Sequence, residues 1–157
     1  MPSRTLLTRA AIATALATPF TFGPPVLGQD EPPATVRAVL DGVRADRAGP
    51  VLCALFPGPE GFPHRPRTSG VRRGRSHPDR GRQVCTFRGI PPGTYAVAVH
   101  HDFDDDGVLD TNLFGKPSEA WGTTGNVTHS FRAPSFEESA FPVEAGATRE
   151  LLVRMHY

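Results

Sequence analysis

Four aspartates follow one another in a short segment with the spacing of oxygen ligands in a calcium loop. They occupy relative positions 1, 3, 5 and 9, and a glycine occupies position 6, where such a loop turns sharply: Asp102, Asp104, Asp106, Asp110 and Gly107. Carboxylate oxygens are preferred ligands of Ca²⁺, and a divalent ion offsets the repulsion between carboxylates held close together. The spacing therefore predicts a cation site in this acidic loop, residues 102–110.

The acidic loop departs from a complete helical calcium loop at its end. Position 12 would hold a bidentate glutamate, but this chain has Leu113 there, and the loop follows a strand. We expect the remaining ligands to come from the Val108 carbonyl and from water, with His101, Asn112 and Glu119 as candidate additional ligands. Such a site would suit the millimolar calcium found outside cells. The alternative is an acidic turn that binds only water.

Two adjacent histidines, His100 and His101, raise the alternative of a transition-metal site, because neutral imidazole binds zinc and copper. Successive strand residues point to opposite faces, so the two rings cannot easily share one ion. One ring would need His129 or His156 nearby in space. Ordinary histidines at a strand end are the simpler interpretation, and a periplasmic transition-metal binder stays open as an alternative.

An enzymatic role would require more than the acidic loop. Asp102 and Asp106 could act as acid and base, or a bound metal could activate water, which makes a metal-dependent hydrolase the second hypothesis. No nucleophile elbow, phosphate loop or HExxH motif accompanies them. We therefore expect no catalytic residues and no organic cofactor, and calcium is the one cofactor that the sequence suggests.

The segments around the acidic loop have the period-two alternation of strands, and no long amphipathic helix is evident. Pro92 and Gly93 favour a type II turn, from which the strand 94–101 leads into the loop with Tyr95, Val97 and Val99 facing the core. The other expected strands span residues 35–43, 51–56, 83–88 and 149–157. This pattern predicts one all-β domain, an immunoglobulin-like or prealbumin-like sandwich of about seven strands with long loops.

Two long loops interrupt the strand pattern. Residues 57–82 are rich in proline, glycine and arginine, which is typical of a solvated basic surface loop. A short helix or strand within this loop is an alternative that the sequence leaves open. Residues 111–146 carry large aromatic side chains and must pack on the sandwich. An ion in the acidic loop would order this second loop, and we expect Phe114 and Trp121 to form a recognition surface there.

The N-terminal residues have the features of a secretory signal. Two arginines precede an apolar run without acidic residues, and Val26 and Gly28 satisfy the small-residue rule for cleavage after Gly28. We expect a signal peptide over residues 1–28 and an exported domain over residues 29–157, periplasmic or extracellular, without a membrane span after cleavage. The net charge is close to zero, which gives no general attraction to nucleic acid. A protein or glycan of the cell envelope is the expected kind of partner.

Export places the two cysteines in an oxidising compartment, where a lone pair favours a structural bridge. Cys53 has the strand parity of Val51 and Leu55, and Cys85 has that of Phe87, so both side chains can point inward. We predict a Cys53–Cys85 disulfide across two strands.

A resemblance to a known family becomes specific in the second half of the chain. Residues 89–157 resemble the small exported bacterial family named as domain of unknown function twenty-one forty-one, and residues 34–62 resemble it more weakly. The matching motifs span residues 93–96, 101–102, 104–107, 109–112, 115–119 and 134–137. The resemblance implies an exported β-sandwich without an established activity. The arginine-rich residues 64–82 depart from the family pattern, and Trp121 replaces another aromatic residue.

The sequence thus favours a calcium-stabilised binding or structural module without catalytic activity, with a metal-dependent hydrolase and a transition-metal binder as alternatives. The hydrolase hypothesis predicts that Asp104→Ala stays folded and loses turnover. The binding-module hypothesis predicts that the same substitution lowers thermal stability.

Overall fold

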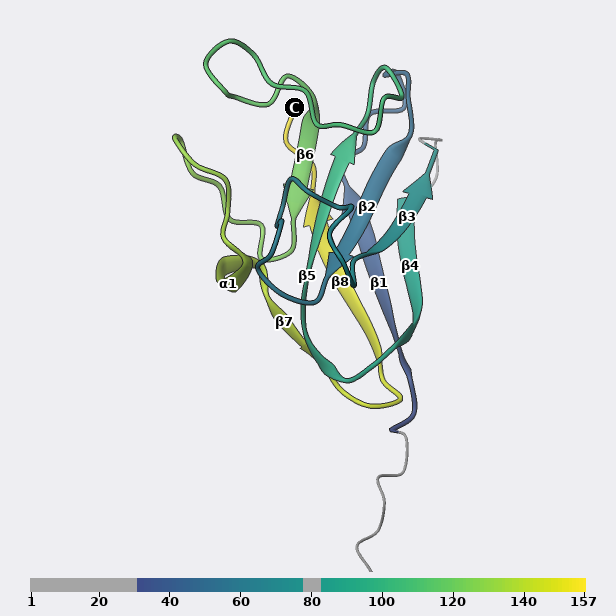
Figure 1. The fold of residues 1–157 in the computed structure, drawn as a ribbon. Coiled ribbons are helices and arrows are strands. Elements are labelled where there is room, and N and C mark those ends of the chain that lie inside the picture. The colour runs from purple at the N-terminus through teal and green to yellow at the C-terminus, as the bar shows by residue number, and fades with distance from the viewer. Residues whose placement is uncertain (1–30, 78–82) are drawn as a thin grey trace, which may run out of the picture.

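The computed structural model describes residues 31–77 and 83–157, which form two β-sheets packed face to face (Figure 1). In the first sheet, β1 (Ala34–Asp41) lies between β4 (Gln83–Ile90) and β8 (Thr148–Arg154). Strand β1 runs antiparallel to β4 and parallel to β8. The predicted signal segment, residues 1–28, lies outside the described residues.

The second sheet has the order β3-β2-β5-β6. Its strands, all antiparallel to their neighbours, are β3 (Arg72–Ser76), β2 (Val51–Phe56), β5 (Gly93–His101) and β6 (Ala120–Thr123). The short strand β7 (Phe141–Val143) pairs with the beginning of β5, and the one-turn helix α1 (Phe136–Ser139) lies just before it. The acidic loop follows β5 directly, so the second sheet positions it.

The core lies between the sheets and consists of the apolar residues that alternate along their strands. Val36, Val51, Val97 and Val153 are fully buried in it, as period-two patterning requires. Cys53 on β2 and Cys85 on β4 form a disulfide that joins the two sheets. The predicted bridge is confirmed.

The all-β sandwich predicted from the sequence is confirmed, with eight strands within the described residues in place of about seven. Strand β2 has the expected bounds, and the other expected strands are found with ends shifted by a few residues. The additional strands formed in the segments expected to be loops: β3 lies in the arginine-rich segment, and β6 and β7 lie within residues 111–146. In the part of the chain that the structure describes, no helix is long and apolar enough to cross a membrane.

The outer face of the second sheet carries two rows of side chains that run across all four strands. Strand register places them side by side: Arg75, Leu52, His100 and Trp121 in the first row, and Arg73, Ala54, Ala98 and Thr123 in the second. Further down this face, Phe62 and Phe136 pack on Phe56, Ala54 and Ala98, and cover that part of the sheet. Ala54 and Ala98 of the second row are thus largely covered, whereas the first row lies under an open space.

Candidate functional site

Asp102 anchors the acidic loop at the end of β5. Its side chain is completely buried, and its two carboxylate oxygens accept the N–H groups of Asp106 at 3.1 Å and Gly107 at 2.9 Å. Gly107 has a φ of 78°, which glycine adopts without strain. The carboxylate at position 1 therefore folds the loop back over itself.

Glu119 fixes the other side of the loop. This carboxylate is 5% exposed, and it accepts the N–H groups of Phe103 and Asp110, the latter at 3.1 Å. Burial raises the pKa of Glu119, and the two N–H donors oppose that rise. Glu119 thus ties the beginning of the acidic loop to its end.

The carboxylates converge in two overlapping groups, Asp102 with Asp104 and Asp106, and Asp104 with Asp110 and Glu119. Within each group, one oxygen from every residue lies within 4.8 Å of the others. Partial desolvation and then the charge of Asp106 raise the pKa of Asp104, which both groups share. A carboxylate oxygen has two lone pairs, so Asp102 and Glu119 retain capacity to ligate beside their N–H bonds.

The other candidate ligands lie in different surroundings. Asn112 uses its side-chain oxygen to accept the N–H groups of Phe114 and Lys116, at 2.9 and 3.1 Å. Val108 is exposed, and its N–H donates to Asp106. The structure therefore brings Glu119 to the aspartates, whereas Asn112 shapes the following turn.

The two histidines point to opposite faces of β5, as the alternation predicts. His101 is buried on the inner face, where its Nδ1 lies 3.0 Å from the Tyr157 hydroxyl. His100 lies on the outer face between Leu52 and Trp121. Burial lowers the pKa of both imidazoles, and neither ring belongs to a carboxylate group described above.

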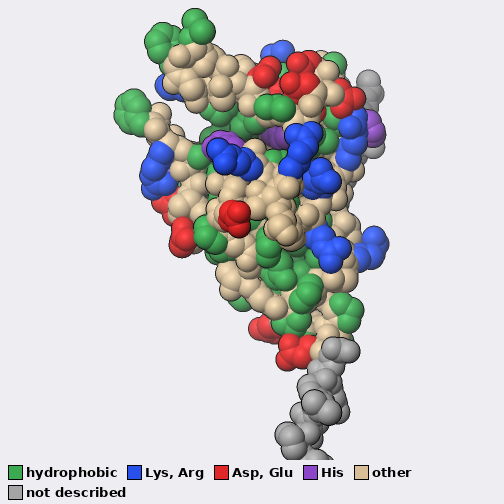
Figure 2. All heavy atoms as spheres, in the orientation of Figure 1, with side chains coloured by type: hydrophobic (Ala, Val, Ile, Leu, Met, Phe, Trp, Pro, Cys, Tyr) green, Lys and Arg blue, Asp and Glu red, His purple; other side chains and the backbone are tan. Residues whose placement is uncertain are grey.

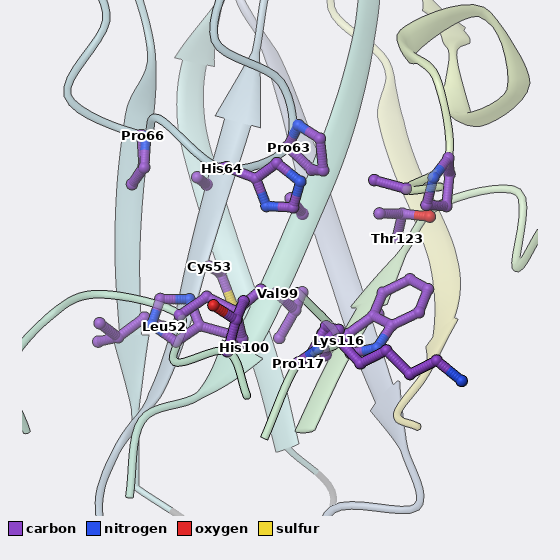
Figure 3. Close-up of a pocket in the computed structure, with 18 of the residues that line it drawn as sticks. Leu52, Cys53, Pro63, His64, Pro66, Val99, His100, Lys116, Pro117 and Thr123 are labelled. Atoms are coloured by element: carbon purple, nitrogen blue, oxygen red, sulfur yellow. The ribbon is translucent and has the colours of Figure 1, made fainter. Parts of the chain in front are cut away.

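A groove of about 780 Å³ occupies the open part of the outer face (Figure 3). All eight residues of the two cross-strand rows line it, and three loops form its walls: residues 63–67, 107–117 and 129–134. Figure 3 labels His100, Leu52 and Thr123 from the strands, and His64 and Pro117 from the loops. Phe114 and Trp121, the expected recognition surface, both line the groove.

The groove is basic, whereas the loop beside it is acidic. Five cationic side chains line it, and none of its lining residues in the described chain is Asp or Glu: Arg67, Arg73, Arg75, Lys116 and Arg132. Figure 2 shows basic side chains gathered around a hollow in which histidine is visible, with carboxylates above it at one end of the molecule. Asp105 of the acidic loop pairs with Arg75 at 2.9 Å, which joins the two regions.

One wall of the groove is held by Glu138. Its carboxylate accepts two bonds from Arg132, at 2.8 and 2.7 Å, and lies 2.9 Å from His129 Nε2. It also closes a capping box with Ser135 at the beginning of α1. The Arg132 guanidinium and the Ser135 N–H hold the pKa of Glu138 far below its usual range.

Glu138→Gln is expected to lower the free energy of unfolding at pH 7 and to leave it nearly unchanged in strong acid. The pKa of Glu138 is lower in the folded chain than its ordinary value of 4.5, so its stabilisation is complete above that value. It declines as pH falls toward the folded pKa. Urea unfolding of both proteins at pH 7, 4 and 2 measures the difference, and a difference that does not shrink with acid contradicts the assignment.

An all-β sandwich with an acidic loop at one strand end and a basic groove on one sheet defines the class of protein. The family model described as an uncharacterized protein conserved in bacteria (DUF2141) matches residues 39–150. The chain belongs to this family, as its motifs indicated. No curated protein and no solved structure matches the chain.

The sequence predicted a recognition surface only at Phe114 and Trp121, and it did not predict the groove or its arginines. Arg73 and Thr123 lie on strands in segments that were expected to be loops, so the sequence did not predict that these two side chains share one face of the sheet. The arginine alternation at 73 and 75 was the available signal, because charged side chains are common on an edge strand.

Proposed function

We propose that this protein is an exported, non-enzymatic binding module of the bacterial cell envelope, with a groove whose wall is a calcium-stabilised loop. The observation that carries the proposal is the groove of about 780 Å³ itself, a volume within the usual range of ligand sites. The disulfide and the N-terminal signal pattern support export.

The acidic loop and the groove are one continuous structure. Gly107, Leu109 and Thr111 line the groove, and the same backbone carries the carboxylates around Asp104. A divalent ion among these carboxylates would fix the spacing of the wall. Hard oxygen ligands suit calcium better than zinc or copper.

The surroundings of Asp102 support a non-enzymatic role. A general acid or base must reach the substrate, but Asp102 is enclosed and both of its oxygens accept backbone N–H groups. The pair of Asp102 and Asp106 is therefore poorly placed for hydrolysis. We assign a structural role to the calcium ion of the acidic loop.

Calcium is expected to raise the midpoint of thermal unfolding of the chelator-treated protein, and Asp104→Asn is expected to abolish that rise. Asp104 belongs to both carboxylate groups, and specific binding to the native state must stabilise it. Differential scanning calorimetry with calcium, magnesium, zinc and copper in turn measures the shift.

Asp105→Asn is the matched control. Asp105 lies in the same loop but in neither carboxylate group, and asparagine tolerates its φ of 62°. The control should keep the calcium response. No shift with any metal would refute the ion site, and a larger shift with zinc or copper would favour the transition-metal alternative.

A further inference from the structure

The floor of the groove contains polar atoms that no part of the described chain satisfies. Thr123 is 2% exposed and its Oγ1 has no hydrogen-bond partner. His100 is partly exposed, but its Nε2 atom is buried and also has no partner in the described chain. Both residues line the groove. Both atoms have almost no accessible surface in this structure, so a ligand reaches them only after the two side chains rotate. Buried polar groups without a partner are unfavourable, so a ligand that supplies hydrogen bonds to the rotated side chains would be stabilised.

The cations of the groove differ in how far they are neutralised. Arg75 pairs with Asp105, and Arg132 pairs with Glu138. Across residues 31–77 and 83–157, no carboxylate forms an ion pair with Arg67, Arg73 or Lys116. These three come from a loop, from β3 and from the segment before β6, so their charges border the groove at separate places.

Between the cations, the groove offers flat apolar surface. Trp121 and Leu52 lie in the first row, and Phe114 lines the groove with 89% of its surface exposed. The floor crosses four strands, which corresponds to roughly 14 Å at the usual strand spacing. An occupant would be an elongated molecule with apolar ring faces.

We propose that the groove binds a short acidic oligosaccharide, whose carboxylates pair with Arg67, Arg73 and Lys116 and whose sugar rings lie on the floor. This deepens the proposed function, since it names the ligand of the same groove. Arginine binds carboxylates through a fork of N–H donors, and sugar hydroxyls supply the partners that Thr123 Oγ1 and His100 Nε2 lack.

The same features disfavour other occupants. A fatty acid would place hydrocarbon against Thr123 Oγ1 and His100 Nε2, and its single carboxylate would leave most of the cations without a partner. A neutral oligosaccharide would leave Arg67, Arg73 and Lys116 unused. An acidic oligosaccharide combines the three properties that the groove requires: several anionic groups, hydroxyls and apolar ring faces.

Trigalacturonic acid is the probe. Its trimethyl ester is the uncharged control, because it has the same three sugar rings without the negative charges. Isothermal titration calorimetry on the disulfide-bonded protein, in metal-free buffer, is expected to show the acid binding at least about tenfold more tightly than the ester. The affinity should also fall as salt is raised. Equal affinity for both, no binding of the acid, or tighter binding of palmitate or single-stranded DNA overturns the proposal.

Two variants locate the ligand. Arg73→Gln is expected to weaken binding about tenfold, whereas Arg72→Gln, next along β3 and outside the groove lining, should leave it unchanged. Thr123→Val should weaken binding severalfold without lowering stability, because it removes a hydroxyl that has no partner in the described chain. Equal losses in Arg72→Gln and Arg73→Gln would place the ligand elsewhere.

The titration is repeated with calcium present, because the proposed ion would fix one wall of the groove. Binding of trigalacturonic acid without a calcium response would refute only the ion site of the proposed function. A calcium response without binding of trigalacturonic acid would refute the acidic-oligosaccharide ligand and leave the calcium-stabilised loop in place.

Discussion

Loss of the Cys53–Cys85 disulfide is expected to lower the free energy of unfolding by about 3–4 kcal/mol. The bridge spans a sequence separation of 32 residues and so restricts the unfolded chain. The bridge also connects the two sheets covalently, and both cysteines are buried, with Cys53 2% and Cys85 3% exposed. Urea unfolding of the oxidised protein and of Cys53→Ala/Cys85→Ala measures the change.

A reducing agent provides the control for this experiment. It should lower the stability of the native sequence toward that of the double variant and should leave the variant itself unaffected. If the double variant is as stable as the oxidised protein, the bridge contributes nothing to the fold, and the chain-entropy explanation is wrong for this protein.

Asp102→Ala is expected to lower the free energy of unfolding by about 3 kcal/mol even when no metal is present. The substitution removes the acceptor of two N–H groups at a fully buried position and leaves those groups unsatisfied. This effect is separate from ion binding, because the two hydrogen bonds form without an ion. Urea unfolding in the presence of a chelator measures it.

Asp104→Asn serves as the comparison for Asp102→Ala. Asp104 is exposed, so its change should alter the metal-free stability by no more than about 0.5 kcal/mol. The two aspartates would then have different tasks, one in folding the loop and one in binding the ion. A loss of less than 1 kcal/mol in Asp102→Ala would contradict the anchoring role.

Alternation of apolar residues was sufficient to predict most of the fold. Strands β2 and β5 bury a complete apolar face, so period two identified both, and the inward parity of the cysteines identified the disulfide. Strand β3 was missed because its arginines show no apolar alternation. Strand β3 forms because it pairs with β2, and this pairing is a tertiary contact that the local sequence does not reveal.

The acidic loop could be predicted from spacing, whereas the groove could not. The aspartates lie within nine residues of one another, so local geometry brings them together. The row of Arg75, Leu52, His100 and Trp121 depends on the register of four strands, which no short segment determines. Glu119 lies between these cases: a local motif suggested it, and the pairing of the next residue, Ala120, with His101 brings it beside the loop.

The two faces of the second sheet are under separate physical constraints. Val51, Val97 and Val99 face inward and hold the sandwich together, while Leu52, His100 and Trp121 face the groove. The hydrogen bonds between the strands belong to the backbone, so an outward side chain can be replaced without disturbing the interior. Substitutions on the outer face can therefore change the lining of the groove while the scaffold stays the same.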